Sequence, residues 1–186
     1  MRRLIAVALA VPMLTLSLVT GTASAATVKG SFEYHVGDAL IQSMGFPAGN
    51  QAAAENGDVV TIIATGTFDS VSRTATGSGT FAHHVAATGQ TITGTLAITG
   101  LISFQSYGNA TPQGLPDSFY GGKLMLSMLA TPDGAPDVHL AAILTVECEL
   151  GSPLPSTVEG VRVNVQDVIN FNKSVFESGA NLYIRL

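Results

Sequence analysis

Apolar and polar residues alternate along much of this chain, and an alternation with a period of two is typical of a β-strand that buries one face. The alternation is clearest in residues 27–36, 58–69, 74–86, 138–150 and 161–165. The sequence has no apolar stripe of the kind that marks a long amphipathic helix. The pattern therefore predicts a protein built from strands.

One short pattern recurs three times in the middle of the chain. It reads Thr-Gly-Thr-Phe at 65–68, Ser-Gly-Thr-Phe at 78–81 and Thr-Gly-Thr-Leu at 93–96, at spacings of 13 and 15 residues. Such spacings suit one strand and one tight turn per unit, as in an up-and-down β-meander. Residues 91–107 are too many for one straight strand, so Gly94 and Gly100 predict a bulge, a bend or a close backbone approach.

Three segments depart from the alternation. Residues 37–56 and 109–122 are rich in Gly, Pro, Asn and Ala, so we expect two long loops there, with a short helical turn at 51–55. Loops of this length often carry function. Residues 123–130 are apolar at both parities, which fits either a strand buried on both sides or a short helix.

These elements predict one all-β domain over residues 26–186. We expect a single-domain antiparallel meander barrel or a closely packed β-sandwich of about eight strands. The 161 residues of that range are enough for one domain with a sizeable core.

Residues 1–25 have the layout of a secretory signal peptide. Arg2 and Arg3 form a basic start, residues 4–14 are an unbroken apolar run that includes Pro12, and Ala-Ser-Ala occupies 23–25. We therefore predict a Sec-type signal peptide cleaved after Ala25. The mature protein would be secreted, extracellular or periplasmic, with no membrane span.

The chain is acidic and poor in charged residues. It has 8 Lys and Arg against 13 Asp and Glu, a net charge of −5, and 11% charged residues, whereas ordinary domains have about 25%. Loss of Arg2 and Arg3 leaves six basic and thirteen acidic side chains, a net charge of −7. A negative chain without a Lys/Arg cluster argues against nucleic acid or an anionic membrane as a partner. The single cysteine, Cys148, falls at an apolar position and is expected to be a buried thiol.

Two adjacent histidines draw attention as possible chemical groups. Consecutive residues of a strand point to opposite faces, so His83 and His84 cannot easily bind one metal ion. The parity of Phe81 places His83 on the inner face, where it needs a hydrogen-bond partner such as Tyr34 or Tyr107. His83 is then either a satisfied interior histidine or a general base in a pocket.

A later stretch carries polar residues of one parity, namely His139, Thr145, Glu147 and Glu149. They fit either a solvated face or part of a cation site. The chain lacks the usual metal-ligand, nucleophile-elbow, phosphate-loop and dinucleotide motifs. We therefore expect no metal and no cofactor.

Several stretches resemble a group of uncharacterised secreted bacterial β-rich proteins. They are Ser-Gly-Thr-Phe-Ala-His at 78–83, Gly-Thr-Leu at 94–96, residues 101–108 and Asn-Phe-Asn-Lys at 170–173. The spacing of Gly and Thr also resembles the small meander barrels of allene oxide cyclases and dirigent proteins. The first resemblance implies a secreted β-protein with no activity attached, and the second implies a barrel.

Three functional hypotheses follow. The first is a non-catalytic secreted module that binds a small apolar ligand or an extracellular protein through its two long loops, with His83, Tyr107, Phe119 and Tyr120 as ligand-binding candidates. The second is a cyclase or isomerase in which His83, Tyr107 and Tyr34 transfer protons on an apolar substrate. The third is a structural cell-surface protein, which would expose strand edges.

Overall fold

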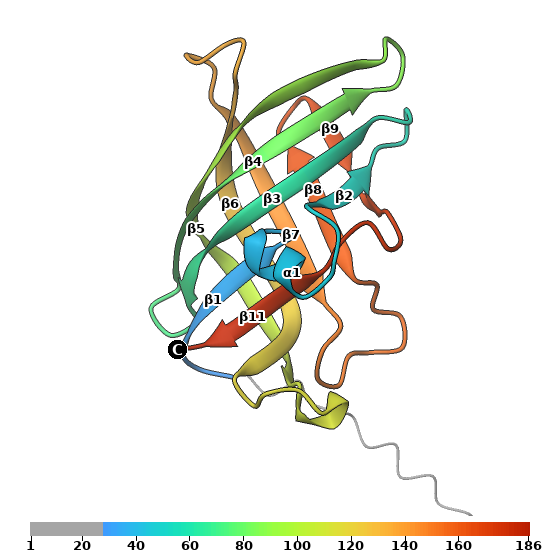
Figure 1. The fold of residues 1–186 in the computed structure, drawn as a ribbon. Coiled ribbons are helices and arrows are strands. Elements are labelled where there is room, and N and C mark those ends of the chain that lie inside the picture. Colours follow the sequence, from blue (N-terminus) through green and yellow to red (C-terminus); the bar gives the residue numbers. More distant parts are fainter. Residues whose placement is uncertain (1–27) are drawn as a thin grey trace, which may run out of the picture.

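The computed structural model describes residues 28–186, so the predicted signal peptide lies outside the described residues. This part of the chain folds into an antiparallel sheet of eleven strands with one short α-helix and one 3-10 turn (Figure 1). The elements are β1 (Ser31–Val36), α1 (Ala39–Ser43), β2 (Asn50–Ala53), β3 (Val59–Asp69), β4 (Thr74–Val85), β5 (Gln90–Asn109), η1 (Thr111–Gln113), β6 (Phe119–Pro132), β7 (Leu140–Cys148), β8 (Gly160–Val165), β9 (Ile169–Phe171), β10 (Lys173–Ser174) and β11 (Asn181–Arg185). The all-β, antiparallel prediction is confirmed. The strands outnumber the expected eight because β2, β9 and β10, of four, three and two residues, escape a periodicity analysis.

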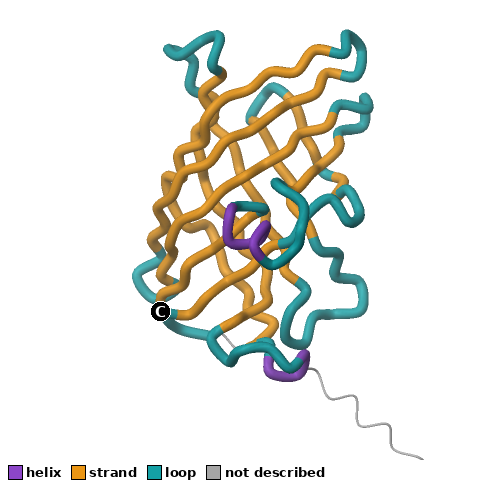
Figure 2. Tube along the Cα trace, in the orientation of Figure 1, coloured by secondary structure: helices purple, strands orange, loops and turns teal. Residues whose placement is uncertain are grey.

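Strand pairing returns to its starting point and closes a ring. The strands β3, β4, β5 and β6 pair in sequence order, as a meander does. The last strand, β11, pairs with both β6 and β1, and β1 pairs with β3. The sheet continues from β6 through β7 and β8 to β9, and loops gather at the two ends of the strands (Figure 2).

The predicted inner parity of β3 is confirmed. Val60, Ile62, Ala64 and Phe68 are each 3% exposed or less. Aromatic rings from several strands fill the space between them, with Phe68 lying 5.1 Å from Phe32 and 4.7 Å from Phe104 between ring centroids. Burial of a side chain of this size stabilises the fold by about 1.5–3 kcal/mol.

Some glycines in or next to the repeat make room for aromatic side chains of neighbouring strands. Gly66 pairs with Gly77 across β3 and β4, and a Cβ atom on Gly77 would lie 2.0 Å from the Tyr34 hydroxyl oxygen. On Gly94 a Cβ atom would lie 2.4 Å from the Phe81 ring. An aromatic ring laid across a strand glycine stabilises a curved sheet.

The strand β5 contains the predicted irregularity but is not divided by it. It runs over 20 residues as one strand and shifts register against β6 at three places, the first between Ile98 and Gly100. The prediction for Gly100 is therefore confirmed as a bulge, while Gly94 provides the close approach. Residues 123–130, whose pattern fits either a strand or a short helix, belong to β6.

The predicted helical turn at 51–55 is wrong. Residues Asn50–Ala53 form β2, which pairs with β3, and the helix α1 lies earlier, at Ala39–Ser43. The helix begins there because the Asp38 carboxylate accepts hydrogen bonds from the backbone N–H groups of Leu40 and Ile41. Within residues 28–186, no helix has the length and apolar character needed to cross a membrane.

Candidate functional site

The outer face of β6 and β7 carries polar residues that oppose one another across the sheet. Leu124, Leu126, Leu144 and Val146 of these strands are buried in the core, so the residues between them project from the other face. Lys123 of β6 pairs directly with Glu147 of β7, and the same register places Met125 opposite Thr145. Gln105 of β5 pairs with Lys123 and Arg162 of β8 pairs with Thr145, so this polar row extends over two further strands.

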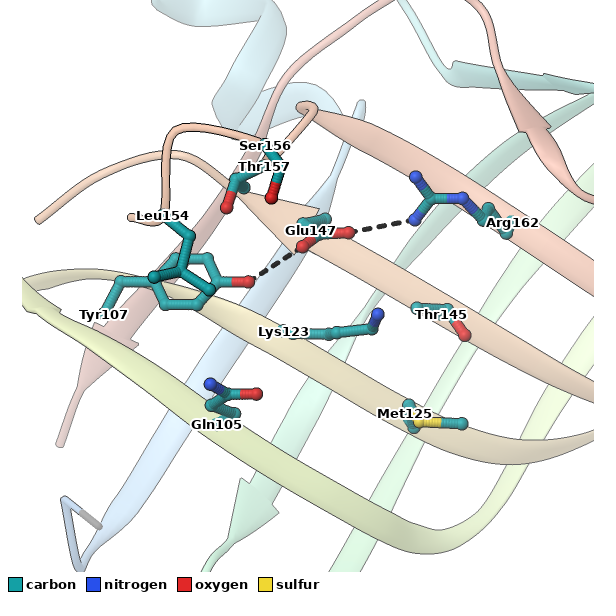
Figure 3. A pocket seen from close by; sticks show the side chains of 10 residues that line it. All are labelled: Gln105, Tyr107, Lys123, Met125, Thr145, Glu147, Leu154, Ser156, Thr157 and Arg162. Atoms are coloured by element: carbon teal, nitrogen blue, oxygen red, sulfur yellow. Dashed lines mark hydrogen bonds and ion pairs between the residues drawn. The ribbon is translucent and has the colours of Figure 1, made fainter. Parts of the chain in front are cut away.

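A hollow of about 430 Å³ lies over this row. Its walls come from β5, β6, β7, β8 and the loop between β7 and β8, residues 149–159, which we name the β7–β8 loop. The lining side chains are Gln105, Tyr107, Lys123, Met125, Thr145, Glu147, Leu154, Ser156, Thr157 and Arg162 (Figure 3). A volume of this size is typical of small-molecule sites.

Glu147 is the centre of a hydrogen-bonded network at this hollow. The Tyr107 hydroxyl donates to Glu147 Oε1 at 2.7 Å, and Arg162 Nη1 donates to Oε2 at 2.9 Å (Figure 3). The Glu147 side chain is 8% exposed and that of Arg162 is 32% exposed. Burial, helped by the hydrogen bond to Glu147, raises the pKa of Tyr107 to about 12, so its hydroxyl keeps the proton that it donates.

Hydrogen bonds to Tyr107 and Gln113 hold the β7–β8 loop over the network. Ser152 N donates to Tyr107 O at 2.7 Å, and Gln113 exchanges two hydrogen bonds with the backbone of Gly151. Gly151 has a φ of +81°, and a Cβ atom there would lie 2.5 Å from the Tyr107 carbonyl oxygen. Only glycine fits this position without strain.

Two glutamates close the base of the same loop. Glu149 N donates to the Glu159 carboxylate at 2.7 Å, and Glu159 N donates to the Glu149 carboxylate at 3.0 Å. Glu159 also accepts a hydrogen bond from Asn181 N at 2.8 Å. Burial raises the pKa of Glu159 to about 7, against the effect of these backbone donors.

Of the residues singled out from the sequence, the structure brings Tyr107, Thr145 and Glu147 to the hollow. Sequence analysis placed Glu147 in a row with His139, Thr145 and Glu149, and only Thr145 and Glu147 of that row line the hollow. Lys123 and Arg162 were not anticipated. The one signal for Arg162 was its polar position between Val161 and Val163 in a short apolar strand.

His83 lies on the core-facing side of β4, as its parity predicted, but away from the hollow. Its Nε2 atom lies 2.9 Å from Asp58 Oδ2, and its ring makes an edge contact with Phe171 at 5.1 Å between centroids. Asp58 also accepts a hydrogen bond from Ala86 N, and this bond, together with His83, lowers the pKa of Asp58. The pair fastens the end of β4 to the turn before β3.

The three residues of the isomerase hypothesis do not share a site. His83 pairs with Ile92 of β5, fifteen residues before Tyr107 on that strand; at about 3.3 Å per residue the two side chains lie tens of ångströms apart. Tyr34 is fully buried and its hydroxyl lies 3.5 Å from Thr76 O. Pairing places Tyr34 level with Gly77, about 20 Å along β4 from His83.

Of the predicted aromatic cluster, Tyr107 alone lines the hollow. Tyr120 is 8% exposed, and its ring makes an edge contact with Phe32 at 5.4 Å in the core. Phe119 opens β6 and pairs with Ile184 of β11. The Tyr107 side chain therefore lies at the hollow on the outer face of the sheet, whereas the Tyr120 side chain lies in the core.

A second polar cluster, around His35, was not foreseen from the sequence. Its Nδ1 atom lies 2.7 Å from Asp38 Oδ2, and its buried Nε2 atom lies 3.7 Å from Glu33 Oε2. Because Asp38 also caps α1, this histidine links β1 to the helix. Among residues 28–186, no group of three or more His, Cys, Asp or Glu side chains is placed to hold a metal ion.

Comparison of the chain with protein-family models, with curated proteins and with solved structures found no match. No relative therefore supplies a ligand, an activity or a partner for the hollow.

Proposed function

We propose that this protein is an exported binding module that holds a small polar ligand in the hollow beneath the β7–β8 loop. The observation that carries the proposal is the Glu147 network on the outer face of the sheet. Removing a charged carboxylate from water costs several kcal/mol even after relaxation, and Glu147 lies outside the apolar core. A fixed charge network at the floor of a hollow supports a role in recognition.

The ligand class differs from that of the first sequence-based hypothesis. An apolar ligand inside the strand ring would compete with the aromatic cluster of Phe32, Phe68, Phe104 and Tyr183, whose ring centroids lie 4.7–6.0 Å apart. The hollow described above is instead lined mainly by polar and charged side chains. A polar ligand fits that lining better.

Binding is favoured over catalysis by the composition of the hollow. Hydrolysis of the glycosidase type uses two carboxyl groups, and the ten lining residues include one carboxylate, Glu147, and no histidine or cysteine. Ser156 and Thr157 contribute hydroxyl groups, but both oxygens of Glu147, the one lining carboxylate that could activate them, already accept hydrogen bonds from Tyr107 and Arg162. The isomerase hypothesis would need His83 and Tyr107 at one substrate, but His83 of β4 pairs with Ile92 near the start of β5, whereas Tyr107 lies near the end of that strand.

The proposal can be tested by nuclear magnetic resonance with a library of small carboxylates, amines and neutral compounds. We expect some compounds to shift the backbone amide signals of Leu154, Thr157 and their neighbours. The variant Thr145→Trp fills the hollow and should abolish these shifts, while Thr95→Trp, on an exposed position of β5, should retain them. A library without any compound that shifts these amides, or shifts that survive in Thr145→Trp, would overturn the proposal.

Export remains part of the proposal. The basic start, the apolar run and the Ala-Ser-Ala site of residues 1–25 support it. We expect the protein recovered from the secreting cell to begin at Ala26, as determined by N-terminal sequencing. Recovery of a cell-retained chain that still begins at Met1 would contradict this prediction.

A further inference from the structure

The charge of the hollow is opposite to that of the chain. Lys123 and Arg162 supply two positive charges and Glu147 one negative charge, so the hollow has a local excess of one positive charge. The whole chain has a net charge of −5. A positive site on a negative protein favours anions over other solutes that reach it.

Lys123 is the source of this excess. It stands between Gln105 of β5 and Glu147 of β7 in the strand register, and its side chain extends across the floor of the hollow between Tyr107 and Arg162 (Figure 3). Within residues 28–186, its amino group forms no ion pair and no hydrogen bond with another side chain. An amino group has three donors, so Lys123 can offer hydrogen bonds to a ligand in the hollow that it lines.

Arg162 also has hydrogen-bond donors that Glu147 does not use. One of its N–H groups is used by Glu147 at 2.9 Å, and a guanidinium carries five in a planar fork. Glu147 thereby fixes the orientation of the guanidinium, and Tyr107 fixes the orientation of Glu147 at 2.7 Å. The arrangement presents a pre-oriented Arg162 beside a free ammonium group, which suits a planar, bidentate anion.

We infer that the ligand is a small hydroxylated monocarboxylate of the sugar-acid type, with its carboxylate between Lys123 and Arg162. The inference rests on the proposed function and adds the class of ligand. One negative charge balances the local excess of one positive charge. The amide of Gln105 and the hydroxyls of Thr145 and Ser156 are suited to ligand hydroxyl groups, while Met125 and Leu154 offer apolar contact to its carbon skeleton.

The decisive experiment compares two ligands that differ in one group. Glucuronate and glucose share a hydroxylated ring, and only glucuronate carries a carboxylate. In calorimetric titrations at low salt we expect glucuronate to bind at least about tenfold more tightly than glucose, because charge-assisted hydrogen bonds are the stronger ones. We also expect binding to weaken in 0.5 M NaCl, because salt screens partly exposed charges.

Matched variants assign the effect to the hollow. Lys123→Gln should lower the affinity for glucuronate about tenfold, while Lys29→Gln removes a charge from an exposed lysine outside the hollow and should leave the affinity unchanged. Lys123→Arg keeps the charge and should retain most of the affinity. A thermal melt of each variant verifies that it is folded. Short oligomers of uronic acid distinguish a free sugar acid from the end of an acidic polysaccharide, since only the latter source predicts tighter binding of the oligomer.

Several outcomes would overturn the inference. Equal binding of glucose and glucuronate, no binding of either, or full affinity in Lys123→Gln would each do so, and tighter binding of inorganic phosphate would remove the carboxylate assignment. These failures are distinct from a failure of the proposed function. If neutral or cationic compounds of the library occupy the hollow and carboxylates do not, the binding module stands and only its ligand class is wrong.

Discussion

Glu147 lies on the outer face of a sheet, where a carboxylate is normally hydrated, yet its side chain is only 8% exposed. Tyr107 and Arg162 satisfy one carboxylate oxygen each. A buried charge is tolerated when it is paired and hydrogen-bonded, and removal of one partner leaves the remainder unsatisfied. At the scale of single residues, the candidate site therefore depends on the hydrogen bonds from Tyr107 and Arg162 to Glu147, and their contribution to stability can be measured.

We predict that Tyr107→Phe lowers the free energy of unfolding by about 1–2 kcal/mol, because it removes a hydrogen bond to a buried carboxylate. In a double-mutant cycle with Glu147→Gln, the two changes should be non-additive by about 1 kcal/mol. Urea denaturation of the four proteins measures both quantities. Tyr120→Phe is the matched control, since the Tyr120 hydroxyl contacts Arg185 instead. Strictly additive effects of Tyr107→Phe and Glu147→Gln would contradict the network.

At the scale of elements, glycines decide how closely strands and side chains approach. Gly66 and Gly77 face each other across β3 and β4, with Tyr34 lying against them. A side chain at either position would collide with Tyr34 and with backbone carbonyl oxygens. Gly66 belongs to the first copy of the repeated pattern and Gly77 directly precedes the second copy, so the close contact between the two strands lies at the repeat.

Gly77→Ala is expected to destabilise the protein by about 2–3 kcal/mol, because an added methyl group overpacks a filled site. Its Cβ atom would lie 2.0 Å from the Tyr34 hydroxyl oxygen and 2.5 Å from Thr65 O. Gly134→Ala is the control, since a Cβ atom there meets nothing within 4 Å. Adding Tyr34→Phe should recover part of the loss in Gly77→Ala, as measured by denaturant unfolding. An effect no larger than that of the control would refute the close contact.

The buried Glu159 at the base of the β7–β8 loop makes the stability of the protein depend on pH. Burial raises the pKa of Glu159 from 4.5 to about 7, so between these values the folded protein binds more protons than the unfolded chain. The contribution of Glu159 to stability is therefore full below about pH 4.5 and decreases as the pH rises toward 7. Glu149, Asn181 and the buried Cys148 are the groups that face it.

In Glu159→Gln the difference between stability at pH 5 and at pH 8 should shrink, because the variant has no proton to lose. Thermal melts across this range measure the difference. Glu55→Gln, at a side chain that is 72% exposed, tests for a general effect of charge removal and should keep the wild-type pH profile. An unchanged profile in Glu159→Gln would show that another group is responsible.

At the scale of the whole molecule, closure of the ring depends on the last strand. β11 pairs with β1 on one side and with β6 on the other. It also buries Leu182 and Tyr183, and the Tyr183 hydroxyl donates to Val146 O at 2.9 Å. Contacts between β1 and β11, which are far apart in the sequence, are therefore required before the core is complete, and this is a long-range event in folding.

A chain that ends at Ala180 is expected to lose cooperative unfolding, because β1 and β6 are left with open edges and Tyr183 is missing from the core. Removal of Leu186 alone, which is 68% exposed, should leave the transition cooperative. Circular dichroism during thermal unfolding separates the two cases. A sharp transition in the chain that ends at Ala180 would mean that the ring is not essential.

The sequence by itself determined the fold class. Alternation in β3 identified its buried residues, and the repeat at 65–96 identified the meander, because side chains on a strand must alternate between faces. Parity also placed His83 on the inner face and Cys148 in the core. The shortest strands escape prediction, since two to four residues carry too little periodicity, and the sequence of β2 predicts a helical turn because Gln and Ala are good helix formers.

Only the tertiary structure decided where the polar residues meet. Tyr107, Lys123, Glu147 and Arg162 come from four strands and are far apart in sequence. Their register across β5, β6, β7 and β8, and the loop that Gln113 holds over them, produce the hollow. Local periodicity determines which face of a strand is buried, but it has no information on which outer-face residues become neighbours. That depends on strand pairing and on loop contacts, which form only when the whole chain is folded.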